Sequence, residues 1–253
     1  MHASDAWEHL RGLQPVSLID WKGRHAAVLF FGGCNLRCPT CHNADLAWRP
    51  QIHPTIHKPD ILAFIKKRRH WLDGLVVSGG EPTIIPDLAR LLRELREYGL
   101  PVKLDTNGLR PHVVEALLSA GLIQEAYVDV KGPWAKYPEL TGGGASAEEA
   151  EGCLSEIFAL TKRFPRAFTF RTTKVPPLDD SDLAAVRAAL PEGFELTVQD
   201  YIPPRRSNAQ TDQEARRMPG DLVHGTDRRS HPQSPQGQRR QGPAPLQASG
   251  PQG

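Results

Sequence analysis

The chain has 253 residues and a formal net charge of +2 at pH 7, and this length suffices for one sizeable hydrophobic core and little more. A charge so close to zero gives no overall field that would draw the protein to nucleic acid. Only four cysteines are present, and three of them share one loop. This usage argues against the disulfide framework of a small secreted domain and fits a reducing cytoplasm.

The first 21 residues carry Asp5, Glu8 and Asp20 and contain no long apolar stretch. They therefore predict neither a signal peptide nor a membrane anchor, and we expect a cytoplasmic protein without a membrane partner. The longest apolar run of the chain, Ala26 to Phe31, has only the length of a strand.

Cys34, Cys38 and Cys41 follow this run with the spacing C-x3-C-x2-C. Three thiolates on one short loop can hold three irons of a cubane iron–sulfur cluster, whose fourth iron then stays open to a small molecule. The alternative is zinc, which usually takes four ligands. His42 or Cys153 could complete such a set, but the sequence contains no second C-x2-C pair.

Short apolar runs alternate with amphipathic helical patterns along the chain. The runs predict six strands, at residues 26–31, 74–78, 101–105, 126–130, 167–174 and 195–201. The patterns predict five helices, at residues 60–69, 87–98, 111–120, 146–163 and 180–190. This alternation implies an α/β fold with a parallel sheet and helices outside it. Because six repeats are too few for a closed eight-stranded barrel, we expect an open, TIM-like (β/α)6 partial barrel.

The sequence changes character after Pro204. Residues 205–253 are rich in Gln, Pro, Gly, Ser and Arg and nearly lack large apolar side chains. Such a segment cannot bury enough surface to offset its chain entropy, so we predict a domain over residues 1–204 and a disordered basic tail over residues 205–253. Arginine pairs leave open a nucleic-acid-binding tail. We favour a solvated tail without specific function, and an extension read out of frame is a third interpretation.

Three polar motifs fall at or just after the carboxyl ends of predicted strands: Ser78-Gly79-Gly80-Glu81-Pro82, Leu104-Asp105-Thr106-Asn107-Gly108 and Asp129-Val130-Lys131. Chemistry gathers at this edge in barrels of parallel strands. Arg171 lies inside the fifth strand, where a charged side chain faces either a polar cavity or an exposed edge. The motifs therefore predict a binding site at the carboxyl edge of the sheet.

In the order and spacing of the cysteine loop and these motifs, residues 17 to 204 resemble the radical S-adenosylmethionine (SAM) superfamily. They look most similar to the small activating enzymes of glycyl-radical proteins, especially the activating protein of anaerobic ribonucleoside-triphosphate reductase. The resemblance implies the partial barrel, with Cys34, Cys38 and Cys41 holding a [4Fe-4S] cluster whose open iron binds SAM. One departure is Thr40, which stands where the family usually has an aromatic residue near the adenine.

The resemblance also implies how SAM is held. Backbone carbonyls at Gly79 and Gly80, or the Glu81 carboxylate, would accept hydrogen bonds from the SAM ammonium, because glycines let a backbone approach a ligand closely. Lys131 and Arg171 would face the SAM carboxylate. The alternative for the glycine motif is a tight turn between a strand and a helix.

Asp105, Thr106 and Asp129 are implied by the same resemblance to help bind a monovalent cation beside SAM. A cap or turn role is the alternative at these positions. The basic run from Lys66 to Arg69 is typical of a solvated helix end, although it could instead face an acidic electron donor. Cys153 fits a buried small hydrophobe.

The resemblance therefore predicts a radical SAM oxidoreductase, in which reductive cleavage of SAM yields a 5′-deoxyadenosyl radical that abstracts a hydrogen atom. Its partner would be a glycyl-radical enzyme, the anaerobic ribonucleotide reductase, and its electron donor a flavodoxin or ferredoxin. One alternative is an enzyme that acts on a small molecule, like the short 7-carboxy-7-deazaguanine synthases. Another is a non-catalytic module with zinc in the cysteine loop.

Overall fold

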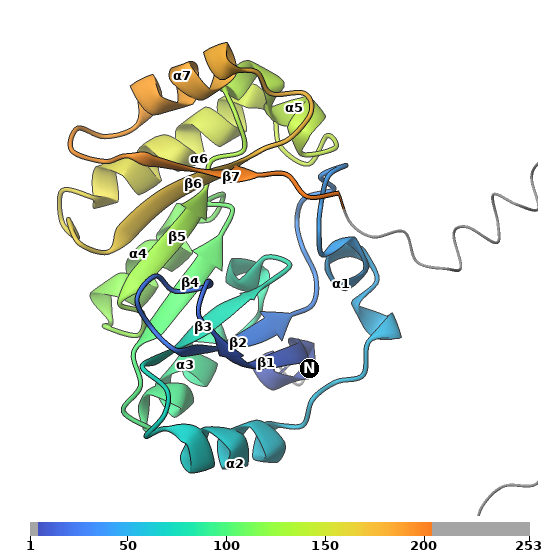
Figure 1. Cartoon of the computed structure of the whole chain (residues 1–253), viewed down its shortest axis with the longest axis vertical. Coiled ribbons are helices and arrows are strands. Elements are labelled where there is room, and N and C mark those ends of the chain that lie inside the picture. The colour runs from blue at the N-terminus through green and yellow to red at the C-terminus, as the bar shows by residue number, and fades with distance from the viewer. Residues whose placement is uncertain (1–4, 204–253) are drawn as a thin grey trace, which may run out of the picture. The chain divides into compact units, whose positions relative to one another are not determined.

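A computed structural model describes residues 5–203 of the chain. They form one curved sheet with helices packed against it (Figure 1). The predicted tail, residues 205–253, and Pro204 at the end of the predicted domain lie outside the described residues.

The sheet contains seven strands in sequence order. They are β1 (Leu10–Ser17), β2 (Ala26–Phe31), β3 (Gly74–Gly79), β4 (Val102–Thr106), β5 (Glu125–Asp129), β6 (Phe168–Lys174) and β7 (Leu196–Asp200). Strands β2 to β7 run parallel to one another, whereas β1 pairs antiparallel with β2. Because β1 and β7 stand at the two ends of this order, the sheet stays open. The predicted (β/α)6 partial barrel is confirmed.

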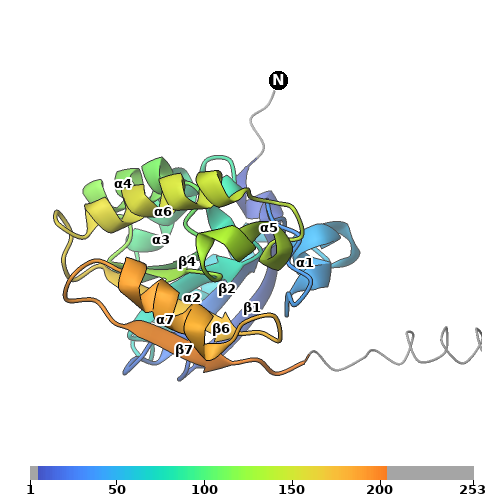
Figure 2. The ribbon, with the colours of Figure 1, turned by 90° about the horizontal axis from the view of Figure 1, so that it is seen from above.

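The α-helices of residues 5–203 are α1 (Ala44–Trp48), α2 (Lys58–Arg68), α3 (Leu88–Arg96), α4 (Pro111–Ser119), α5 (Tyr137–Leu140), α6 (Ala147–Leu160) and α7 (Asp180–Ala189). Short 3₁₀ turns occupy Ala6–His9, Pro50–Ile52, Pro82–Ile84 and Trp134–Lys136. Figure 2 shows α4 and α6 side by side on one face of the sheet. The five predicted helices are present, with ends that differ by a few residues, and the short α1 and α5 were not predicted. None of the helices in this part of the chain has both the length and the apolar character needed to cross a membrane.

Strand β1 is the one strand that the sequence pattern did not predict. It contains Gly12 and Pro15, and both residue types weaken a strand signal. Proline is tolerated here because β1 stands at the edge of the sheet, where the pairing with β2 also shifts register between Gln14 and Ser17. The edge position of β1 therefore explains why a segment that contains glycine and proline still forms a strand.

Most of the hydrophobic core lies between the sheet and the helices. Helix α3 contributes four leucines at helical spacing, each at most 3% exposed: Leu88, Leu91, Leu92 and Leu95. From the sheet, residues such as Leu104 and Val128 join the same core. The apolar periodicity of the sequence therefore sets which face of the sheet the helices cover.

The inner face of the sheet, opposite the helices, is apolar at β2 and β3 and polar at β4, β5 and β6. Strand side chains alternate between faces, so the neighbours of Leu104 and Val128 point inward. Trp21 packs on that face against β2 and β3, together with Val28 and Val76. The charged residues of β4, β5 and β6 occupy the rest of it, and they form one wall of the site described below.

Candidate active site

A pocket of about 250 Å³ lies at the carboxyl ends of the parallel strands. It is bounded by the loops that follow β2 and β3 and by the ends of β4, β5 and β6. All the residues predicted to bind the cluster, SAM or a cation line it: Cys34, Cys38, Cys41, Gly79, Gly80, Glu81, Asp105, Thr106, Asp129, Lys131 and Arg171. The structure thus brings every predicted site residue together, while the individual roles stay predictions.

The cysteine loop, residues 33–43, leaves the end of β2 and is fixed by backbone hydrogen bonds. The amide of Arg37 donates to the carbonyl of Thr141 (3.0 Å), which ties the loop to the end of α5. The amide of Cys41 donates to the carbonyl of Cys38 (3.0 Å), which forms a turn between the second and third cysteines. The three thiols are therefore presented from a constrained backbone.

Each of these thiols is partly buried, and none forms a disulfide. Burial raises the pKa of Cys34 to about 11. It also raises the pKa of Cys38 and of Cys41, although the ammonium of Lys131 acts in the opposite direction. Because a thiol must lose its proton to bind metal, the positive charge of bound iron would stabilise the thiolates here.

The donor set fits an iron–sulfur cluster better than a single metal ion. Within residues 5–203, no three His, Cys, Asp or Glu side chains are placed to hold one ion. A cubane cluster does not require such convergence, because each thiolate binds a different iron. Of the two candidates for a fourth zinc ligand, His42 lines the pocket but its Nε2 lies 2.7 Å from the carbonyl oxygen of Ile202, and Cys153 is on α6, outside the pocket.

The glycine motif brings the loop after β3 against the cysteine loop. The amide of Glu81 donates to the carbonyl of Gly33 (2.9 Å), and the amide of Gly80 donates to the carbonyl of Phe31 (2.8 Å). Gly79 has a φ of +122°, and a Cβ atom on Gly80 would overlap the carbonyl oxygen of Gly33. Only glycine allows this close approach of two backbones.

Replacing Gly80 by alanine is expected to push the two loops apart and to lower both stability and cluster loading. Overpacking of this kind costs about 1–3 kcal/mol, and Gly33, which would have to move, directly precedes Cys34. Urea unfolding of the apoprotein and the iron content after anaerobic reconstitution measure the two effects. Gly152→Ala is the matched control, because a Cβ there meets no atom within 4 Å. Equal iron content in the two variants would show that the contact is dispensable.

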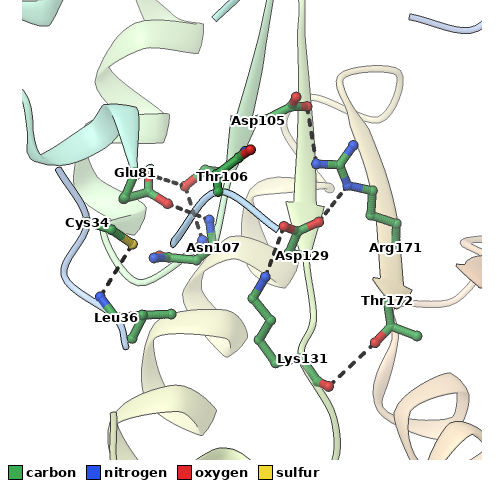
Figure 3. A network of polar contacts seen from close by, with 12 residues as sticks. Cys34, Leu36, Glu81, Asp105, Thr106, Asn107, Asp129, Lys131, Arg171 and Thr172 are labelled. Carbon is green, nitrogen blue, oxygen red and sulfur yellow. Dashed lines mark hydrogen bonds and ion pairs between the residues drawn. The ribbon is translucent and has the colours of Figure 1, made fainter. Parts of the chain in front are cut away.

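Glu81 is 1% exposed, and its carboxylate holds the end of β4 against the loop that follows β3. One carboxylate oxygen accepts from the amide (3.1 Å) and hydroxyl (2.6 Å) of Thr83 and from the hydroxyl of Thr106 (2.8 Å). The other accepts from the amide of Asn107 (2.7 Å) (Figure 3). The side chain of Asn107 donates in turn to Asn35 (2.8 Å) in the cysteine loop. Burial raises the pKa of Glu81, and these hydrogen bonds oppose that shift. Because the carboxylate already accepts four bonds, the motif's backbone carbonyls are the better candidates for the SAM ammonium.

Charged side chains of alternating sign form the wall opposite the cysteine loop. Nε of Arg171 donates to Oδ1 of Asp129 (2.5 Å), and Nζ of Lys131 donates to its other oxygen (3.0 Å) (Figure 3). A second guanidinium nitrogen lies 3.5 Å from Oδ1 of Asp105, which also accepts from Nζ of Lys103 (2.7 Å). These five residues, the ion-pair chain, carry three positive and two negative charges. Of these residues, Lys131 and Arg171 line the pocket, and their positive charges are suited to an anionic group such as a carboxylate.

The pairing keeps Asp129, Lys131 and Arg171 ionised. Burial disfavours the charged form of Asp129, but Arg171 and Lys131 outweigh it and hold the pKa of its carboxyl well below its usual range. Burial likewise works against the charges of Lys131 and Arg171, yet the acids beside them raise the pKa of both groups. Since the pKa of Asp129 is depressed, its pairing persists at neutral pH and is lost only as pH falls through that low pKa.

Lys103 belongs to the ion-pair chain but was not among the residues predicted from the sequence. The signal was present, because Lys103 is a charged residue inside an apolar strand, as Arg171 is. It also lies two residues before Asp105, and strand periodicity puts the two on one face. Asn35 and Asn107 were missed as well, since only the fold reveals that they join the cysteine loop to the end of β4.

The segment that follows β7 returns to the cysteine loop (Figure 1). The ring of His42 stacks on that of Tyr201, with centroids 5.3 Å apart, and its Nε2 lies 2.7 Å from the carbonyl oxygen of Ile202. Tyr201 is held in turn by a small apolar cluster that includes Leu140. His42 lines the pocket together with Thr40, so the loop does present an aromatic ring there, two residues after the expected position.

A chain that ends at Asp200 is expected to lose cluster stability, whereas one that ends at Pro204 keeps the His42 contacts. Tyr201→Ala should reproduce the loss, since an aromatic pair contributes about 0.5–1.5 kcal/mol, which is roughly a twofold to tenfold faster loss of iron. The measurement is the decay of cluster absorbance after addition of a chelator under anaerobic conditions. Tyr201→Phe keeps the ring and serves as the control. Identical decay of Tyr201→Ala and wild type would contradict the role of the stack.

The basic run from Lys66 to Arg69 lies at the end of α2, shortly before β3 begins. A helix between parallel strands runs opposite to them, so its end lies at the amino edge of the sheet. The cysteine loop is at the carboxyl edge. The exposed run is therefore best explained as a solvated helix end, and the structure gives no support to an electron donor docking there.

A model of the radical SAM superfamily matches residues 28–190. A protein of Methanocaldococcus jannaschii that is named as a glycyl-radical enzyme activating enzyme is 32% identical over 195 residues, which cover 76% of this chain and 79% of that protein. The pyruvate formate-lyase-activating enzyme of Staphylococcus aureus is 35% identical over 107 residues, 39% of this chain and 41% of that enzyme. The 7-carboxy-7-deazaguanine synthase of Halobacterium salinarum is 38% identical over 76 residues, 30% of this chain and 29% of that enzyme. The chain thus aligns with less than half the length of the last two proteins.

Among solved structures, SuiB of Streptococcus suis bound to SAM is similar in fold. The TM-score is 0.50 at 14% identity, over 75% of this chain and 47% of that one. At this identity the likeness concerns the fold alone. The family match, the long alignment and the pocket at the cysteine loop agree: the chain belongs to the radical SAM superfamily, within it to the glycyl-radical enzyme activating enzymes, and its cofactors are a [4Fe-4S] cluster and SAM.

Proposed function

We propose that this enzyme installs a glycyl radical on a partner enzyme, and that the partner is anaerobic ribonucleoside-triphosphate reductase. The observation that supports the first step most strongly is the alignment over 79% of a protein named as an activating enzyme of this kind. Only Cys153 remains outside the cysteine loop, so the sequence offers no ligand set for a second cluster. The choice of the reductase rests on the sequence resemblance.

In this proposal the chain's own residues hold and orient the cofactors. Cys34, Cys38 and Cys41 would bind three irons, and a cluster bound there would supply the electron for the reductive cleavage of SAM to methionine and a 5′-deoxyadenosyl radical. Lys131, at the end of the ion-pair chain, and Arg171, within it, would face the SAM carboxylate. The site opens at the carboxyl edge of the sheet, where a glycine-bearing loop of a partner can reach it.

A flavodoxin or a ferredoxin is the proposed electron donor, and the cytoplasm is the proposed compartment. Three free thiols that must stay reduced to bind iron fit such a compartment. A second candidate function is radical chemistry on a small molecule, which the 76-residue alignment with a 7-carboxy-7-deazaguanine synthase favours.

The test combines the cluster-loaded enzyme with the reductase, SAM and dithionite under anaerobic conditions. We expect a glycyl-radical signal in the electron paramagnetic resonance spectrum of the reductase and one 5′-deoxyadenosine for each radical. A reductase whose radical-bearing glycine is replaced by alanine is the matched control and should give no signal. Turnover of SAM with a small substrate alone, and no radical on the reductase, would favour the second candidate.

A further inference from the structure

Lys103 is enclosed inside the barrel. Its side chain is 0% exposed, although lysine is rarely buried without a partner. Nζ lies 2.7 Å from Oδ1 of Asp105 on one side and 3.8 Å from the centroid of the Tyr127 ring on the other. A carboxylate and the face of an aromatic ring are both groups that attract a cation. Burial lowers the pKa of Lys103, and the carboxylate of Asp105 opposes that shift. Lys103 therefore places an ammonium directly behind the pocket wall, against Asp105, which lines the pocket.

The residues implied to bind a monovalent cation are all engaged by other groups. Asp105 pairs with Lys103 and Arg171, and Asp129 pairs with Arg171 and Lys131. The Thr106 hydroxyl donates to Glu81 and accepts from the amide of Gly108 (3.1 Å). These residues therefore do not fit a metal cation, which would have to displace a cationic side chain or sit beside one.

We propose that Lys103 is a built-in cation that takes the place of the monovalent metal ion beside SAM. The ammonium neutralises Asp105, which leaves the guanidinium of Arg171 directed at Asp129 and leaves Lys131 at the pocket end of the chain. SAM binding by this protein is then independent of added K⁺ or Na⁺. This inference requires that the protein binds SAM, and it does not depend on which enzyme is the partner.

The first test needs only the wild-type, cluster-loaded protein. Its affinity for SAM is measured by isothermal titration calorimetry in potassium, sodium and tetramethylammonium chloride at one ionic strength, since tetramethylammonium is too large for a site between two carboxylates. We expect dissociation constants that agree within about twofold. A tightening of fivefold or more in K⁺ or Na⁺ would overturn the proposal, because it would show a metal cation site beside SAM.

The second test replaces the charge. Lys103→Met removes the ammonium while keeping an unbranched side chain, and should weaken SAM binding at least fivefold in tetramethylammonium chloride. K⁺, Na⁺ or NH₄⁺ should restore part of this loss, because Asp105 is then open to a cation. Lys136→Met is the matched control: that lysine pairs with Asp182 (2.6 Å) away from the pocket. Wild-type affinity in Lys103→Met would overturn the proposal, and if the variant does not fold, the wild-type salt series still decides it.

Discussion

Replacing Cys38 by alanine is expected to abolish cluster binding and, with it, all cleavage of SAM. The three thiols line one pocket. The hydrogen bond from the amide of Cys41 to the carbonyl of Cys38 constrains the backbone that carries the middle thiol. Two thiolates cannot hold three irons of a cubane, so one further iron would be left without a protein ligand. Iron content and visible absorption after anaerobic reconstitution measure the first loss. Chromatographic detection of 5′-deoxyadenosine measures the second, which should fall below detection.

Cys153→Ala is the matched control for this experiment. Cys153 lies on α6, partly buried against the hydrophobic core and outside the pocket. Loss of a partly buried thiol should cost no more than about 1 kcal/mol of stability and should leave iron loading unchanged. Iron and SAM cleavage retained by Cys38→Ala would contradict the assignment of the cluster ligands. A wild-type protein that takes up zinc and no iron would do the same.

The elements that position the site could be predicted because their periodicity is local. The leucines of α3 recur at helical spacing, and the strands are short apolar runs that end in polar motifs. Once parallel strands are inferred, their carboxyl ends must share one edge, which places the cysteine loop, Glu81 and Asp129 near one another. This is why all the predicted residues line one pocket.

What could not be predicted depends on contacts between distant parts of the sequence. The stacking of His42 on Tyr201 joins residues 159 positions apart, and Tyr201 belongs to no motif. The partners of Glu81 were equally hidden, because its carboxylate is aimed at the end of the next strand and not at a ligand. A sequence pattern indicates that a charged residue needs a partner, but only the fold decides which partner it has.

Replacing Glu81 by leucine is expected to lower the free energy of unfolding by about 3–5 kcal/mol, the cost of removing one partner from a buried charged network. The amides of Thr83 and Asn107 would be left buried without an acceptor, at about 1–3 kcal/mol each. Glu81→Gln keeps one acceptor oxygen but turns an N–H group towards the amide of Asn107, so we expect an intermediate loss of about 1–3 kcal/mol. Urea unfolding of the apoprotein gives these values without interference from the cluster.

The decisive comparison is with Glu97→Gln, because Glu97 is exposed at the end of α3 and its change should stay within about 0.5 kcal/mol. If Glu81 contacts SAM instead of bracing the loops, Glu81→Gln would unfold like the Glu97 variant and lose only SAM affinity. If Glu81 holds the two loops together, Glu81→Gln lowers both the free energy of unfolding and the iron content. The reason is that Asn107, which Glu81 holds, donates to Asn35 inside the cysteine loop. The two outcomes separate a ligand-binding carboxylate from one that shapes the site.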